Sequence, residues 1–250
     1  MIDQKKIERE FRRIKNLGYI KSHRINNTGI GKTFEDYLGV DENNLKDPDF
    51  AGFEVKSQRQ ISKSYITLFT KSPSYPKGAN AILKETFGKP DKKFTSIKVL
   101  HTSIFGDRFN TYSDKYGFKL NVNYQKERID FIAKLLNKNQ IIDKNIYWSF
   151  DDLKRSINKK LKALFVVLAE TKIENGFEYF HYTEANVYLN IKFSKFLKAI
   201  ESRSIMFDIR IGAYKTQGRP NFGKPHDHGS GFRIKRDNLQ EIFEDMFNIK

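Results

Sequence analysis

The sequence contains no cysteine. That absence excludes disulfide bonds, thiolate catalysis and cysteine zinc sites, so any metal ion would have to be bound by oxygen or imidazole ligands. Long hydrophobic segments are also missing. No stretch approaches the roughly 18 apolar residues of a membrane span, and the first residues, MIDQKKIEREFRRIK, lack the hydrophobic core of a signal peptide. We therefore expect a cytoplasmic protein with no membrane partner.

Negative charge is also scarce. Against 46 lysines and arginines there are only 30 acidic residues, which leaves a formal net charge of +16. Such an excess favours a polyanionic partner, foremost nucleic acid, because lysine and arginine release condensed counterions when they neutralise phosphates. A genome-wide bias toward lysine and asparagine would produce the same excess. The charge alone therefore indicates a partner and not a reaction.

The chain nevertheless has the composition of a folded protein, with 38% hydrophobic and 14% aromatic residues. No repeat, low-complexity linker or sharp change in composition divides it, so we predict a single domain over residues 1–250 with a mixed α/β (α+β) architecture. Apolar periodicity predicts helices at 2–17, 33–38, 150–161, 193–202 and 237–247. Strands are predicted at 53–57 and 64–70, which would form a hairpin, and at 118–122, 128–133, 164–169, 207–213 and 230–234.

The segment PDFAGFEVK contains the residues best suited to chemistry. Glu54 and Lys56 are two apart on a predicted strand, so both side chains project from one face while Val55 points to the other. Asp49 stands in the preceding turn, and a short Ala-Gly connection would bring its carboxylate near Glu54. Two carboxylates beside an ammonium group are therefore expected at one point.

Carboxylate oxygens at that point suit Mg²⁺, which prefers octahedral oxygen coordination and retains water and phosphate oxygens in its shell. A bound metal can lower the pKa of a water molecule and can stabilise the charge that builds on a phosphate. Lys56 would orient the water or offset charge. An ordinary surface strand with Glu and Lys on either side of a buried valine gives the same short pattern, so the motif needs support from the rest of the chain.

This segment, with GKTFEDYLG ahead of it, resembles the PD-(D/E)xK nucleases, and more narrowly the MutH-like group that contains the type II restriction endonucleases of MvaI/BcnI type. Further segments are most similar to the MvaI-like members: NNTGIGKTFED, TLFTKSP followed by GAN, YWSFD, KIEN, DIRIGAY, and HDHG followed by FRI. They extend from Asn26 to Ile234, so the resemblance covers nearly the whole chain. It implies a restriction-endonuclease-like fold with a MutH-type core, a central mixed sheet flanked by helices, and two lobes that form a DNA cleft.

The resemblance also implies a set of site residues. The catalytic positions fall on Glu35, Asp49, Glu54 and Lys56. Glu35 is the acidic residue of the short helix that a capping box at Thr33 is predicted to open. Asp49, Glu54 and the backbone carbonyl of Val55 would bind Mg²⁺, for which Mn²⁺ can substitute. Asp47 stands at the longer spacing that MutH-like proteins use, but MvaI-like proteins share the shorter spacing, which favours Asp49.

The activity that the resemblance implies is hydrolysis of phosphodiester bonds in double-stranded DNA at a short specific site. For the MvaI-like members that site is CCWGG, cut before the central base by a monomer that nicks the strands in turn. No nucleotide cofactor is expected, and a cognate DNA methyltransferase would protect host DNA without being a bound subunit. A related site such as CCSGG, a MutH-like nicking enzyme that needs a partner, and a DNA-binding protein without hydrolysis are the alternatives.

We assign a catalytic lobe to about 26–75 and a DNA-recognition hairpin to about 205–235. A two-stranded ribbon fits the major groove, where Arg210 and Arg233 can each bond both acceptors of a guanine. Asp227 can accept from cytosine N4, while His226 or His228 can donate to guanine. Phosphate contacts or salt bridges would equally explain the two arginines, and a metal site is the alternative for the histidines.

Two further residues are predicted to contact DNA. Tyr214 borders the recognition hairpin. Lys32 lies in GIGKT, whose glycines would shape a loop that meets the DNA backbone, with Lys32 bound to a phosphate. GIGKT is not interpreted as a nucleotide-binding loop, because Asn26 stands where such a loop needs glycine.

Overall fold

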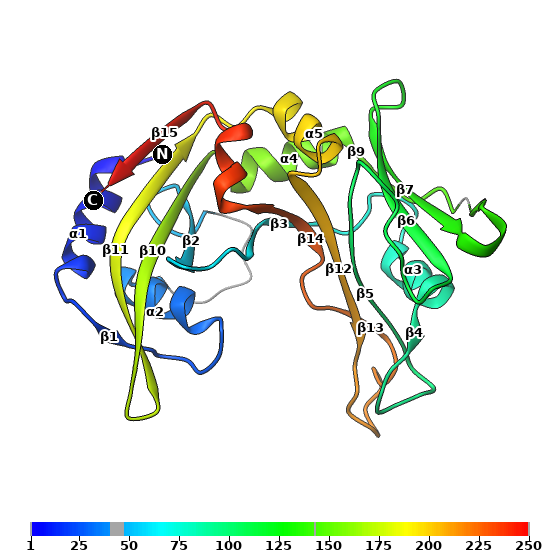
Figure 1. Ribbon diagram of the computed structural model, residues 1–250, viewed down its shortest axis with the longest axis horizontal. Coiled ribbons are helices and arrows are strands. Elements are labelled where there is room, and N and C mark those ends of the chain that lie inside the picture. Colours follow the sequence, from blue (N-terminus) through cyan, green and yellow to red (C-terminus); the bar gives the residue numbers. More distant parts are fainter. Residues whose placement is uncertain (1, 41–47, 143, 250) are drawn as a thin grey trace. The chain divides into compact units, whose positions relative to one another are not determined.

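The computed structural model describes residues 2–40, 48–142 and 144–249 (Figure 1). Asp47, the alternative to Asp49, lies outside these ranges. The chain forms two compact units, each built from segments that are distant in sequence. Unit 1 takes its described residues from Met1–Ser64, Ile157–Lys192 and Arg236–Lys250, and unit 2 takes its own from Tyr65–Ser156 and Phe193–Lys235.

Within its described residues, unit 1 contains a five-stranded sheet. The strand order is β1-β11-β10-β2, and β15 adds to β11. The strands are β1 Ile20–Lys21, β2 Glu54–Arg59, β10 Ala163–Glu174, β11 Phe177–Leu189 and β15 Asp245–Ile249. β10 lies between β2, which is parallel to it, and antiparallel β11. Because both of its faces are covered, its sequence is an uninterrupted apolar run from Ala163 to Ala169.

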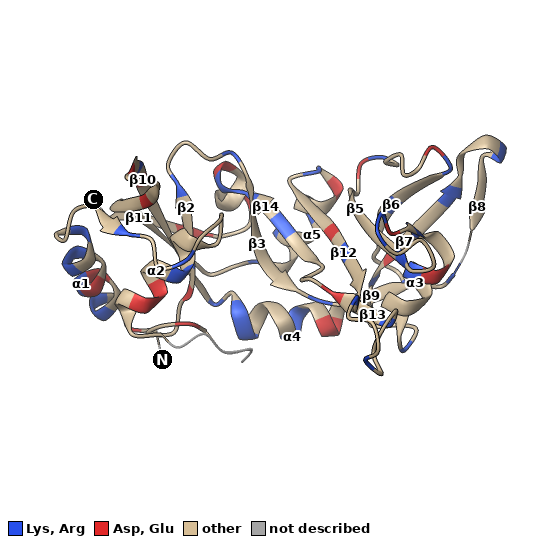
Figure 2. Ribbon diagram, turned by 90° about the horizontal axis from the view of Figure 1, so that it is seen from below, with Lys and Arg blue, Asp and Glu red and all other residues tan. Residues whose placement is uncertain are grey.

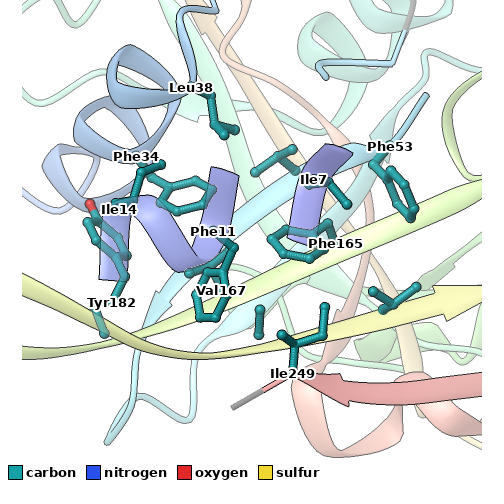
Figure 3. Close-up of a cluster of buried hydrophobic side chains, with 14 of the residues drawn as sticks. Ile7, Phe11, Ile14, Phe34, Leu38, Phe53, Phe165, Val167, Tyr182 and Ile249 are labelled. Carbon is teal, nitrogen blue, oxygen red and sulfur yellow. The ribbon is translucent and has the colours of Figure 1, made fainter. Parts of the chain in front are cut away.

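Two helices, α1 Gln4–Lys15 and α2 Gly29–Leu38, pack on one face of this sheet, and their buried side chains form one cluster with those of β10 and β11 (Figure 3). α1 buries Ile7, Phe11 and Ile14, as their helical spacing predicted. Phe11 and Phe53 both meet the ring of Phe165 edge-on, at centroid distances of 6.0 and 6.1 Å. This cluster supports the strand that carries the predicted catalytic residues.

α2 confirms part of the prediction of a short helix at 33–38. Phe34 and Leu38 are buried, and the helix ends at Gly39, whose φ of 73° is the left-handed conformation that glycine favours. The helix begins at Gly29, however, and not at the capping box predicted at Thr33. Thr33 lies inside the helix and is fully buried, so packing against the core extends the helix past that capping signal.

Unit 2 contains two sheets in its described residues. The larger has the order β3-β14-β12-β5-β4 with β13 paired to β12, and the smaller has the order β6-β7-β8 with β9 paired to β7. The bounds are β3 Tyr65–Thr70, β4 Lys89–Pro90, β5 Lys98–Ile104, β6 Tyr116–Asn123, β7 Arg128–Leu135, β8 Gln140–Ile142, β9 Tyr147–Ser149, β12 Ile205–Ala213, β13 Pro225–Asp227 and β14 Gly231–Lys235. The helices are α3 Ala79–Phe87, the short 3₁₀ helix η1 Leu136–Lys138 and α5 Phe193–Glu201. α4 Phe150–Lys160 begins in unit 2 and ends in unit 1.

Two predicted elements are wrong. The strands at 53–57 and 64–70 do not form a hairpin, because β2 pairs with β10 and β3 pairs with β14 in a different sheet. The helix predicted at 237–247 is instead the 3₁₀ helix η2 Arg236–Glu241 followed by β15. There the backbone pairs with β11, and those ladder hydrogen bonds outweigh the apolar periodicity of the segment.

The predicted recognition strands do pair, but inside a larger sheet. β12 is antiparallel to β14 as predicted, and it also pairs with β13 and β5. The ribbon is therefore a supported part of a six-stranded sheet and not a free two-stranded arm. The predicted mixed α/β architecture is confirmed.

Basic residues occur on elements of both units, α1 and α4 among them (Figure 2). None of the helices in the described ranges has both the length and the apolar character needed to cross a membrane.

Candidate active site

β2 carries two of the predicted catalytic residues on one face. Val55, between them, is 1% exposed and packs into the cluster formed with α1 and α2, so Glu54 and Lys56 project to the opposite face of the sheet. Glu54 is buried, with 4% of its surface exposed, and its Oε1 lies 2.6 Å from Lys56 Nζ. The carboxylate and ammonium pair that the spacing predicted is present.

The turn before β2 folds back, as the Ala-Gly connection predicted. Ala51 and Gly52 have positive φ angles of 49° and 84°, which reverse the chain direction. Asp49 Oδ2 then accepts a 2.8 Å hydrogen bond from the backbone N of Val55. Because Val55 directly follows Glu54, the carboxylate of Asp49 is anchored at the same end of β2 as Glu54.

A second lysine, Lys160, reaches Glu54 from the end of α4. Its Nζ lies 3.2 Å from Glu54 Oε2, the oxygen that Lys56 does not contact. The sequence predicted the helix that ends at Lys160 but gave no sign of this contact, since Lys160 and Glu54 are 106 residues apart. Only the parallel register of β2 with β10, which follows α4, brings the two together.

Glu35 lies on α2, near Gly31 and Tyr182. A Cβ atom built on Gly31 would lie 3.8 Å from Glu35 Oε1. Burial raises the pKa of the Tyr182 hydroxyl, and the negative charge of Glu35 raises it further. None of these contacts joins Glu35 to Asp49 or Glu54, so its place in the catalytic set stays a prediction.

The donors at this site fit a hard divalent cation. Asp49 and Glu54 offer carboxylate oxygens, which Mg²⁺ and Mn²⁺ prefer over softer ligands. Among the described residues, no group of three or more His, Cys, Asp or Glu residues is arranged to hold a metal ion. The predicted ligands Asp49, Glu54 and the Val55 carbonyl would leave positions for water in the shell of such a cation, as Mg²⁺ commonly requires.

Lys32, the predicted phosphate contact, lies on α2 and is engaged within the protein. Its Nζ lies 2.6 Å from Asp36 Oδ1, and His23 Nδ1 lies 2.8 Å from Asp36 Oδ2. The hydrogen bond from Lys32 is the main cause that lowers the pKa of Asp36. A phosphate that binds Lys32 would have to share the ammonium group with Asp36.

The two predicted guanine-reading arginines meet at Asp208, which sequence reasoning missed. Asp208 and Arg210 share one face of β12, where they alternate with the buried Ile209. Arg210 Nε donates to Asp208 Oδ2 at 2.8 Å, and Ser103 Oγ donates to Oδ1 at 3.1 Å. Arg233 Nε, from β14, lies 3.1 Å from the same Oδ2, at ion-pair distance but without hydrogen-bond alignment. The Asp-Ile-Arg spacing in DIRIGAY was the one available signal.

The predicted histidines form an aromatic cluster with Tyr214. The rings of Tyr214 and His226 stack at 4.4 Å with an interplanar angle of 15°. The His228 ring lies 4.4 Å from that of His226 and 6.5 Å from that of His101. Burial lowers the pKa of His228, and the charge of His226 lowers it further. Gly212 makes room for this ring, because a Cβ at that position would lie 2.6 Å from His228 Nε2.

Asp227 is held by three hydrogen bonds. Its Oδ1 accepts from the backbone N of Gly229 at 3.0 Å and of Ser230 at 2.6 Å, and its Oδ2 accepts from Asn80 Nδ2 at 2.8 Å. Ser230 Oγ in turn accepts from the backbone N of Arg210 at 2.8 Å. An ionised carboxylate has about four acceptor positions, so Asp227 retains capacity for a base amino group.

Comparison with known proteins finds similarity to restriction endonucleases over nearly the whole chain. A model of the MvaI/BcnI restriction endonuclease family matches residues 8–243. The solved complex of restriction endonuclease MvaI with a cognate DNA substrate is 36% identical, covers 100% of each chain, and has a TM-score of 0.90. Restriction endonuclease MvaI in the absence of DNA is 35% identical over 100% of this chain and 99% of that one, with a TM-score of 0.66. No curated protein matches.

Proposed function

The chain belongs to the MvaI/BcnI restriction endonuclease family, and on that premise we propose that it cleaves double-stranded DNA at CCWGG, before the central base, with Mg²⁺ as cofactor. The family itself makes the chain a site-specific deoxyribonuclease of the type II class. The observation that carries the proposal is the buried Glu54 carboxylate paired with Lys56 at 2.6 Å, beside the anchored Asp49.

Asp49, Glu54 and the Val55 backbone carbonyl are the ligands that we assign to Mg²⁺, for which Mn²⁺ would substitute. Members of the family generally use a divalent metal. A bound divalent ion supplies Lewis acidity, which lowers the pKa of water and stabilises negative charge on a phosphate. Lys56, fixed against Glu54, can orient the attacking water or offset charge on the phosphate. Glu35 completes the proposed catalytic set.

Site recognition is assigned to the six-stranded sheet of unit 2. Arg210 and Arg233 would each donate to N7 and O6 of a guanine, and His226 and His228 would supply further donors. Asp227 would accept from cytosine N4 with its remaining acceptor capacity. A site with CC and GG flanks requires hydrogen-bond acceptors for its cytosines and hydrogen-bond donors for its guanines, and these residues supply both kinds of group.

Two contacts outside the base-reading set complete the proposed DNA interface. Tyr214, stacked on His226, would lie beside the bases, and Lys32 would contact a backbone phosphate. The protein would act as a monomer that nicks the two strands in turn. A cognate methyltransferase in the same cell would protect host DNA as a separate protein.

Digestion of a sequenced plasmid with Mg²⁺, followed by sequencing of the ends, tests this proposal. We expect linear product from the purified protein alone, with ends at CCWGG, and no product with Lys56→Ala. Cleavage at sites without CC and GG flanks would refute the specificity, and ends at CCSGG would reassign the central base pair. Supercoiled plasmid that is nicked only when a second protein is added would indicate a MutH-like enzyme. Mg²⁺-independent binding without cleavage would indicate a DNA-binding protein.

A further inference from the structure

The sequence motif that predicted the active site places one lysine beside Glu54, but in the structure two lysines contact its carboxylate. Lys56 contacts Oε1 at 2.6 Å and Lys160 contacts Oε2 at 3.2 Å. We propose that Lys160 is a positioning residue of the catalytic centre, which fixes the orientation of the Glu54 carboxylate and competes with the metal ion for Oε2. This inference rests on the proposed function, because it takes Glu54 to be a metal ligand.

Strand register determines where Lys160 lies. α4 ends at Lys160 and β10 begins at Ala163, so very little chain separates the helix from the strand. In β10, Leu164 stands opposite Glu54 of the parallel strand β2. Leu161, directly after the helix, is fully buried, and its packing fixes the position of the helix end. The end of α4 is therefore held beside Glu54 by the same pairing that orders the sheet.

Because Glu54 is buried, its contacts with both lysines matter for the site. With only 4% of its surface exposed, Glu54 has lost most of its hydration, and a buried carboxylate is costly unless it is paired. One ammonium group on each oxygen satisfies both ends of the carboxylate, so it cannot rotate without breaking a pair. The side chains of Lys56 and Lys160 are themselves only 28% and 23% exposed, which limits the solvent screening that weakens surface ion pairs.

The local charge predicts competition with a cation. Two ammonium groups contact the single carboxylate of Glu54, and only the nearby Asp49 carboxylate balances the second positive charge. A divalent ion that binds Oε2 must displace Lys160 or approach against its charge. Lys160 therefore lowers the affinity of the free protein for the ion, while it keeps the carboxylate in one orientation.

Lys160→Met tests both effects, because methionine keeps much of the apolar stem and removes the charge. Mn²⁺ binding to the DNA-free protein is measured by calorimetry, and cleavage is measured as a single-turnover rate at saturating Mg²⁺. We expect Mn²⁺ to bind about three- to tenfold more tightly, because a competing charge is gone. Cleavage should slow by about ten- to a hundredfold, because a carboxylate held by Lys56 alone is less well oriented. Lys162→Met, at an exposed position two residues on, should change neither measurement.

A cleavage rate within twofold of the wild type, or an Mn²⁺ affinity that does not rise, would overturn the inference. Lys160→Arg retains the charge and should bring both measurements back toward wild-type values. Should the methionine variant fold poorly in a thermal unfolding assay, Lys160→Gln repeats the test. Glu54→Gln separates this inference from the proposed function. Wild-type cleavage by that variant would refute the assigned active site, whatever Lys160 does.

Discussion

Asp208 and Arg210, two residues apart on one face of β12, are joined by a 2.8 Å hydrogen bond from Nε to Oδ2. The same oxygen lies 3.1 Å from Arg233 Nε, and the hydroxyl of Ser103 holds the other oxygen. One carboxylate thus orients both arginines that we propose as guanine readers. A loss of Asp208 should therefore affect recognition and leave the proposed catalytic residues of unit 1 unchanged.

Replacing Asp208 by Asn removes the charge and keeps the shape. We expect affinity for the cognate site to fall about ten- to a hundredfold, because a good bidentate guanine contact contributes about 1–3 kcal/mol of discrimination. Affinity for DNA without the site should rise, since a negative charge leaves the face that we propose contacts DNA. Metal-free binding titrations with the two duplexes measure both, and Asp107→Asn, at an exposed position after β5, is the control. Affinities that move in parallel would contradict the shared-anchor role.

Arg210→Lys and Arg233→Lys keep the positive charge and remove the planar fork that can bond N7 and O6 together. Each variant should lose about ten- to a hundredfold in the ratio of cognate to non-cognate cleavage, while its non-specific binding stays near that of the wild type. Competition cleavage with two plasmids gives this ratio. If a variant keeps the full ratio, that arginine contacts the backbone or serves a salt bridge.

Lys56→Ala should abolish most of the cleavage activity and leave the fold intact. The rate should fall by at least about a hundredfold, which is typical when a group that stabilises transition-state charge is removed. The free energy of unfolding should change little, because Lys160 still pairs with Glu54. Single-turnover cleavage and thermal unfolding measure the two quantities. A large loss of stability would assign Lys56 to the fold.

Gly212→Ala should disturb recognition through His228. The added Cβ would lie 2.6 Å from His228 Nε2, too close for either group to stay in place. We expect loss of site preference similar to that of His228→Ala. In a double-mutant cycle, the second substitution should then add little to the first. Additive losses would show that Gly212 acts through another neighbour.

The histidine cluster predicts a pH dependence of stability. The pKa values of His101 and His228 lie below the ordinary value of 6.5, mainly through burial. Arg210 and His226 contribute to these shifts, and Asp208 and Asp227 oppose them. The unfolded chain therefore binds protons at a higher pH than the folded protein does. This contribution to the free energy of unfolding is complete above a pH of about 6.5 and is lost as the pH falls below it.

Thermal unfolding of the wild type and of His228→Gln, between a pH of about 5 and about 7.5, tests this dependence. The variant should lose stability less steeply as the pH falls, because one of the two histidines with a lowered pKa is gone. Equal slopes would assign the effect to other groups.

Local signals predicted much of the fold. Ile7, Phe11 and Ile14 marked the buried face of α1, and Glu54 and Lys56 marked one face of β2 by their spacing alone. These predictions succeeded because each depends on the period of one helix or one strand. The resemblance of the chain to a known family then fixed the fold class and the type of activity.

What failed or was missed depends on pairing between distant segments. Residues 237–247 have a helical apolar pattern, but the chain end pairs with β11 instead. The partnership of Lys160 with Glu54 follows from the register of β10, and that of Asp208 with Arg233 follows from the neighbouring strands β12 and β14. No local period contains this information.

The bond that holds Asp49 comes from a backbone amide, that of Val55. Every residue except proline offers the same donor, so substitution at position 55 can alter the packing beneath the strand without deleting the anchor. The position of Asp49, the proposed catalytic aspartate, therefore tolerates a change of side chain at position 55 but not a change in the length of the turn. Among related proteins that have diverged in sequence, insertions or deletions between positions 49 and 55 should be far rarer than replacements of Val55 itself.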